Sequence, residues 1–216
     1  ENGGVGGNGT AQDAGGFIAY PFGKTWGTGH GGQNGMSRSI NNAYGSFFNP
    51  MLPGTPGGYH DFRYVGGGAI VATVSGTLTV DGAVSSGSAT SVGRGSGWSS
   101  KAPAPGSINL TAGSLAGSGT ITANGASGKT SVDSNSYGAS GGGRIAVRLT
   151  GTESTFSDSW KDRILARGYT YTSNLANPTN SASAGSVYLQ TMAQPEKGGT
   201  IIIRNDGGIS CLRPIS

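Results

Sequence analysis

The stretch Gly119-Thr-Ile-Thr-Ala-Asn-Gly125 decides the fold predicted for this chain, because it recurs. Gly76-Thr-Leu-Thr-Val-Asp-Gly82 precedes it and Arg163-Ile-Leu-Ala-Arg-Gly168 follows it, and the closing glycines are each 43 residues apart. Alternating apolar and small polar residues have the period of a β-strand, and a fixed spacing indicates a repeat architecture. The three stretches therefore predict equivalent strands that share one core. Their central apolar residues are Leu78, Ile121 and Ile164.

A second type of strand precedes each of these stretches. The four copies are Ala69–Val74, Ser107–Ala112, Arg144–Leu149 and Ser186–Gln190. Each is too short to bury its own apolar face, so successive copies are expected to stack in register around a narrow core. This register places Ile70, Ile108 and Ile145 together in the core.

The composition supports an ordered β protein. Of 216 residues, 43 are glycine and 11% are charged, and the glycines lack the three-residue period of collagen. We therefore predict an all-β chain, a right-handed parallel β-helix (a solenoid) with long decorating loops. The alternative is a β-sandwich, which also uses repeated short strands. Residues 1–65 are expected to form a glycine- and aromatic-rich amino-terminal cap or decorated first turns, and residues 66–216 the repeat region.

The unit Gly117–Gly125, followed by Gly141-Gly-Gly-Arg-Ile145, resembles a repeat of large bacterial surface and secreted proteins. These are glycine-rich parallel β-helix proteins of the adhesin or autotransporter-passenger kind, and the resemblance covers about residues 66–208. It implies an extracellular or cell-surface location and a structural or adhesive role. It assigns no functional residue.

Residues 151–168 allow two interpretations. Ser157 is suited to cap a short helix that carries Phe156, Trp160 and Ile164 on one face. The 43-residue spacing instead makes Ile164–Gly168 the third repeat strand, which is the interpretation favoured here.

Charge and ligand chemistry exclude several functions. The net charge of +4 comes from scattered lysines and arginines, which argues against nucleic acid as a partner. One cysteine, Cys211, and two distant histidines form no recognisable zinc site, and no apolar run is long enough to cross a membrane as a helix. No cofactor is therefore expected. Calcium needs only oxygen ligands, so Asp81 and Asp133 are its weak candidates.

The densest polar and aromatic run, Tyr59–Tyr64, contains the weak catalytic candidates. His60 is a potential base, Asp61 could orient it, and Arg63 could neutralise a substrate carboxylate. Neighbouring residues of a strand point to opposite faces, however, so a packing role is favoured. A fragment of a polysaccharide-active β-helix enzyme, a lyase or a glycoside hydrolase, stays the alternative function.

Aromatic rings on a weakly charged surface are suited to contact sugars. Trp98, Trp26 and Tyr59 are the candidates for carbohydrate binding. The favoured function is therefore a non-catalytic structural or adhesive segment of a secreted or cell-surface bacterial protein, with a polysaccharide or host-surface glycan as partner.

The two ends of a stacked array need covers, because they expose strand edges and an open core. The aromatic-rich residues 17–65 are the expected cap at the amino end. At the carboxyl end, the β-branched run Ile201–Ile203 is followed by a short polar stretch. We therefore expect the rest of a longer precursor, or another copy of the chain, to cover that end.

Overall fold

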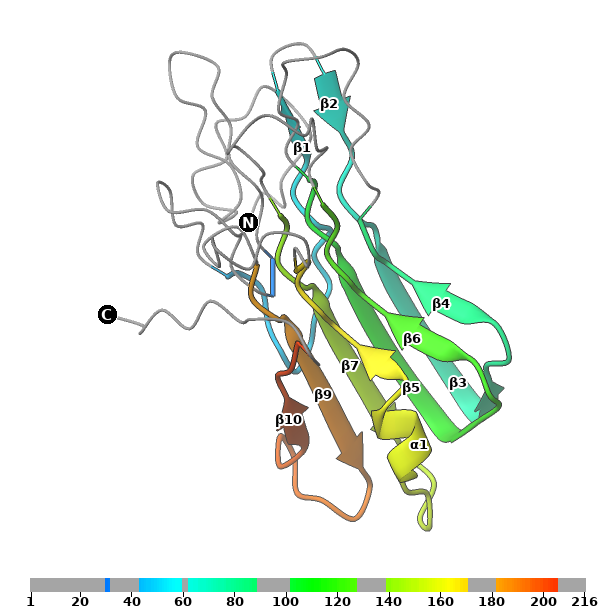
Figure 1. Ribbon diagram of the computed structural model, residues 1–216. Helices are drawn as coiled ribbons and strands as arrows, with labels where there is room; N and C mark the ends of the chain where they lie inside the picture. Colours follow the sequence, from blue (N-terminus) through cyan, green and yellow to red (C-terminus); the bar gives the residue numbers. More distant parts are fainter. Residues whose placement is uncertain are drawn as a thin grey trace.

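The computed structural model describes residues 30–31, 43–59, 62–88, 102–127, 139–170 and 182–205, with the backbone alone at 58–59 and 62–64. The main sheet has five strands in the order β10-β9-β7-β5-β3 (Figure 1). Four of them are mutually parallel, and the edge strand β10 is antiparallel to β9. Their bounds are β3 Ala69–Thr79, β5 Ser107–Ala116, β7 Arg144–Leu149, β9 Ser186–Thr191 and β10 Thr200–Ile202.

A second, smaller sheet lies beside the main sheet, and a hairpin and one helix complete the described elements (Figure 1). The second sheet is parallel and has the order β4-β6-β8, with bounds Ala83–Ser85, Thr120–Thr122 and Ile164–Leu165. The helix α1 (Asp158–Lys161) lies between β7 and β8 in the chain. The hairpin pairs β1 (Gly57–Tyr59) with β2 (Phe62–Tyr64) in antiparallel fashion.

The two parallel sheets share one hydrophobic core. Every second side chain of β5, β7 and β9 points into it, and β6 and β8 contribute Ile121 and Ile164 from the other side. The predicted register of the main sheet is confirmed, because Ile70 pairs with Ile108, which pairs with Ile145. Apolar contact between successive strands is therefore what fixes the register.

Leu78, Ile121 and Ile164 share one core as predicted, but the predicted register is wrong for Leu78. Ile121 does pair with Ile164, but its partner on the other side is Val84 of β4. Leu78 instead pairs with Leu115, because β3 continues past a register shift between Val74 and Thr77 and stays in the main sheet. Leu78, in the stretch that begins at Gly76, therefore pairs with a residue 37 positions later in the chain, rather than 43.

The predicted fold class is also wrong. The structure has mixed α/β character, with a mainly parallel five-stranded sheet, a small parallel sheet and a short helix, rather than an all-β parallel β-helix. Strand β10 reverses direction at one edge of the main sheet, and the hairpin β1–β2 is antiparallel. The parallel pairs likewise contradict the alternative β-sandwich, since such sandwiches are built from antiparallel strands. Repeat spacing predicted the parallel pairs among β3, β5, β7 and β9 and the pair of β6 with β8, but it carried no information on these departures.

The two interpretations of residues 151–168 are both partly correct, since a helix and a strand follow one another. The predicted N-cap is confirmed, because the Ser157 hydroxyl accepts a hydrogen bond from the backbone N–H of Trp160. Trp160 is buried in the core, with Phe156 packed against it. The helix ends before β8, whose Ile164 keeps its pairing with Ile121.

Candidate binding surface on the outer face of the main sheet

The outer face of the main sheet carries the polar side chains of its strands, and residues 43–56 lie against it. Alternation along β5 and β7 turns Ser107, Asn109 and Arg144 away from the core. The Ser107 hydroxyl donates to the carbonyl of Leu52 at 2.7 Å, and Nε of Arg144 donates to the carbonyl of Tyr44 at 2.7 Å. Side chains of the sheet therefore hold a preceding segment by its backbone.

Phe47 and Phe48 of this segment belong to a cluster of aromatic rings and neighbouring side chains, which we call the aromatic patch. It consists of Phe47, Phe48, Asn49, Met51, Tyr188 and Lys197. The Phe47 ring meets Phe48 edge-on at 5.4 Å and Tyr188 edge-on at 6.1 Å between centroids. Phe47 is 40% exposed and Met51 is 54% exposed, whereas Tyr188, which Phe47 contacts, is buried. Edge-to-face packing fixes the orientation of the exposed ring.

Cations and amides surround the patch. Nζ of Lys197 lies 5.5 Å from the centre of the Phe48 ring, and the guanidinium of Arg148 lies 5.6 Å from the centre of Tyr188. Nη1 of Arg148 donates to Oδ1 of Asn109 at 2.9 Å, and Nδ2 of Asn109 donates to Oδ1 of Asn49 at 2.8 Å. This chain of hydrogen bonds connects strand β7 through β5 to the segment that carries Phe47.

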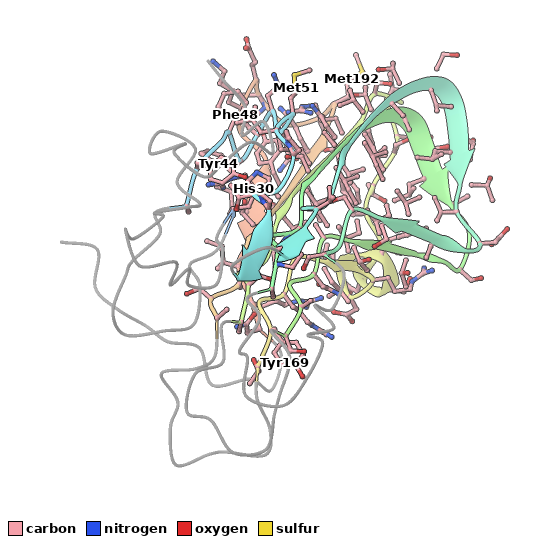
Figure 2. The ribbon with its side chains drawn as sticks, turned by 90° about the horizontal axis from the view of Figure 1, so that it is seen from above. His30, Tyr44, Phe48, Met51, Tyr169 and Met192 are labelled. Carbon is pink, nitrogen blue, oxygen red and sulfur yellow. The ribbon has the colours of Figure 1, made fainter. Side chains whose placement is uncertain are left out.

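A buried histidine anchors the same segment at the amino end of β5. Nδ1 of His30 donates to the carbonyls of Pro105 and Gly106 at 3.0 and 3.1 Å. The backbone N–H of Tyr44 donates to the carbonyl of His30 at 2.8 Å, and the two rings lie 4.5 Å apart (Figure 2). Figure 2 also shows Phe48 on the same side of the ribbon as this pair.

The anchor is held in its neutral form. Burial, with a smaller contribution from the nearby Arg144 guanidinium, lowers the pKa of His30 to about 4. Burial also raises the pKa of the Tyr44 hydroxyl, which donates to the carbonyl of Pro53 at 2.8 Å. Nε2 of His30 is buried and has no hydrogen-bond partner among the described residues. His30 is therefore a packing and hydrogen-bonding residue at neutral pH.

Most residues predicted from the sequence as site residues lie outside the described part of the chain. These are Trp26, His60, Asp61, Trp98 and Asp133. Tyr59 lies in β1 and Arg63 in β2, where only the backbone is described. Their proposed roles in carbohydrate binding and catalysis stay predictions.

Asp81, a weak candidate for calcium, takes part in a turn. Its Oδ1 accepts a hydrogen bond from the backbone N–H of Ser118 at 3.0 Å. Gly117, next to Ser118, has a φ of 101°, which glycine adopts without strain. The carboxylate thus joins the turn after β3 to the turn after β5. In the part of the chain that the structure describes, no group of three or more His, Cys, Asp or Glu residues could hold a metal ion.

The aromatic patch was only partly foreseeable from the sequence. The aromatic content of residues 17–65 singled out the segment with Phe47 and Phe48, but not its partner Tyr188, which looks like an ordinary strand residue. Comparison of the chain with protein-family models, curated proteins and solved structures finds no match. In the described residues, no helix is long and apolar enough to cross a membrane.

Proposed function

We propose that the chain is a non-catalytic structural and adhesive segment of a secreted or cell-surface bacterial protein, and that its aromatic patch contacts carbohydrate. The observation that carries the proposal is the exposed Phe47 ring, which Tyr188 orients. A ring with a fixed orientation loses little conformational entropy when a sugar packs against it. Asn49 and Lys197, beside the two phenylalanines, offer hydrogen-bonding groups for hydroxyls.

The structural part of the proposal rests on how the charged side chains are used. Arg144 bonds to the carbonyl of Tyr44 and to the hydroxyl of Ser186. Arg163 donates to the carbonyls of Gly117 and Gly119 and lies 4.1 Å from the Trp160 ring. These groups connect one segment of the chain to another. The resemblance of the glycine-rich repeat to those of bacterial surface and secreted proteins supports the location.

A glycan array followed by calorimetry tests the adhesive role. We expect the chain to bind one or more polysaccharides, and Phe47→Ala to weaken binding about fivefold, since one aromatic contact contributes on the order of 1 kcal/mol. Val65→Ala is the matched control, because Val65 is an apolar residue that is 84% exposed outside the aromatic patch. Equal affinity of the Phe47→Ala and wild-type chains would place carbohydrate binding elsewhere.

The alternative function is tested on the same polysaccharides. Incubation with neutral and uronate-containing polymers is expected to release neither unsaturated products nor reducing ends. Turnover that His60→Ala or Asp61→Ala abolishes would replace the non-catalytic proposal with a lyase or a hydrolase.

A further inference from the structure

The edge of the main sheet formed by β3 is long and uncharged. The strand has 11 residues, Ala69-Ile-Val-Ala-Thr-Val-Ser-Gly-Thr-Leu-Thr79, without a charged residue or a proline. It pairs with β5 on one side, and within the described ranges no strand pairs with its other side. Unpaired N–H and C=O groups on such an edge are a template for a further strand.

The core is incomplete at this edge. Ile108 and Ile145, at the same level in β5 and β7, are fully buried, whereas Ile70 is only half-buried. Ala72, Val74, Leu78 and Val84 at this end are likewise packed against the core but only partly buried. A strand added beside β3 would cover the members of this apolar row that lie on β3, and removal of apolar surface from water would favour its binding.

Glycines at this edge leave space for another backbone. A Cβ atom added to Gly106 would collide with the carbonyl oxygen of Gly68, and one added to Gly119 would collide with that of Gly82. The glycines at the corresponding places on β3 and its flanks meet nothing within 4 Å. They are Gly68, Gly76 and Gly82. Elsewhere in the sheet, such glycines lie where a neighbouring backbone approaches closely. Among the described residues no backbone lies against a Cβ added to Gly68, Gly76 or Gly82, whereas just before them the backbone of Gly54 bonds to Gly67.

We infer that β3 pairs with β3 of a second copy of this chain, antiparallel and centred on Val74, to form a two-fold symmetric dimer. Antiparallel pairing about Val74 brings the whole of β3 against itself, since Val74 is its middle residue. Half-buried Ile70 then lies opposite half-buried Leu78, and exposed Val71 lies opposite exposed Thr77. Half-buried apolar side chains of both copies thus meet over a joint core, and the exposed side chains, which are threonine, serine, alanine and Val71, meet on the outside.

Charge and symmetry favour a second copy over a different protein. Two chains that each carry +4 repel at most faces, but β3 offers a long contact without charge. An uncharged edge has no group that selects a partner of opposite sign. A second copy has the same alternation of half-buried and exposed side chains along β3, so the two strands match each other. Two-fold dimers are also the commonest closed assemblies.

Sedimentation velocity over a range of protein concentrations tests the dimer and its register. We expect the wild-type chain to dimerise. The double variant Val71→Lys/Thr77→Lys should be monomeric at the same concentrations, because two like-charged pairs then face each other across the two-fold axis. Val71→Lys/Thr77→Glu should dimerise, since the same positions now form ion pairs. Both side chains are exposed, so circular dichroism should show an unchanged fold.

Two further variants exclude other arrangements. Ile201→Lys, at a similarly exposed apolar residue of the opposite edge strand β10, should leave the dimer intact. Val71→Cys/Thr77→Cys in a Cys211→Ser background should form a disulfide-linked dimer under oxidation. The proposal is overturned if the wild-type chain is monomeric, as it would be if residues 1–29 of its own chain cover β3. It is also overturned if the lysine–lysine and lysine–glutamate variants assemble equally, or if Ile201→Lys dissociates the dimer.

Discussion

Strands β3 and β7 share a sequence pattern but have different surroundings. Each begins after a glycine, and each has an isoleucine at its second position, Ile70 in β3 and Ile145 in β7. Strand β7 is paired on both edges, whereas β3 is paired with β5 alone among the described strands. Ile145 is therefore fully buried, while Ile70 keeps part of its surface in water. Burial in this sheet follows from the place of a strand in the strand order, since the motif is the same.

The outer faces differ in the same way. Over β7, Arg144 bonds to the carbonyl of Tyr44, and Ala146 is fully buried. On β3, Val71 is 53% exposed. The opposite edge strand, β10, shows how an edge can be protected, because it is short, antiparallel and followed by Arg204, which pairs with Asp162 at 3.0 Å. Ile202 of β10 packs against the core, and whether an outside partner covers this strand stays a prediction.

The largest expected difference between the two strands comes from a buried charge. Ile145→Asp should destabilise the chain by more than about 4 kcal/mol, because it leaves an unpaired carboxylate in the core. Ile70→Asp should cost about 1–2 kcal/mol, since its carboxylate can reach water at the edge. Both are measured by urea denaturation in the Val71→Lys/Thr77→Lys background, in which the β3 edge stays open. Equal losses would show that β3 is covered in the monomer.

Acid should weaken the attachment of residues 43–56 to the outer face of β5 and β7. That face would then be open to solvent, as the outer face of β3 is. The pKa of His30 is lowered in the folded chain to about 4 from an ordinary 6.5, so the unfolded chain takes up a proton first as the pH falls. The stability that neutral His30 gives is complete above pH 6.5 and is lost as the pH falls towards 4. The loss amounts to about 3 kcal/mol.

Denaturation midpoints measured every half pH unit check this effect, with His30→Gln as the control. Glutamine keeps one hydrogen-bond donor for the carbonyls of Pro105 and Gly106 but does not titrate. Arg144 and Tyr44, which face His30, keep their charge states across this range. Between pH 6.5 and 4, the free energy of unfolding should therefore fall less steeply with pH in the variant. The difference in slope should correspond to one proton fewer taken up on unfolding. An unchanged slope would assign the acid sensitivity to carboxylates elsewhere.

The sequence predicted local pairing better than it predicted the architecture. The row of Ile70, Ile108 and Ile145 was predictable, because apolar alternation allows one register for stacked strands. The reversal at β10 was not, because Thr200–Ile202 has the same β-branched residues whichever direction its neighbour runs. The aromatic patch was half-predictable, since segment composition indicates rings but not the distant Tyr188 against which they pack.

The smallest expected difference concerns a single methyl group. A Cβ added to Gly143, just before β7, would meet the carbonyl oxygen of Gly106, and this backbone lies inside the sheet and cannot move freely. Gly143→Ala should therefore cost about 2 kcal/mol, a typical value for overpacking. A Cβ added to Gly68, just before β3, meets nothing within 4 Å.

Gly68→Ala is the matched control for this last comparison. Its effect on the free energy of unfolding should lie within about 0.5 kcal/mol of zero, as for most surface substitutions. Thermal and urea denaturation of both variants in the Val71→Lys/Thr77→Lys background measure the difference. Because neither substitution adds a charge or a polar group, the difference reports only whether a backbone lies against the glycine. A loss of 2 kcal/mol in Gly68→Ala would mean that another segment of the same chain already occupies the space beside β3.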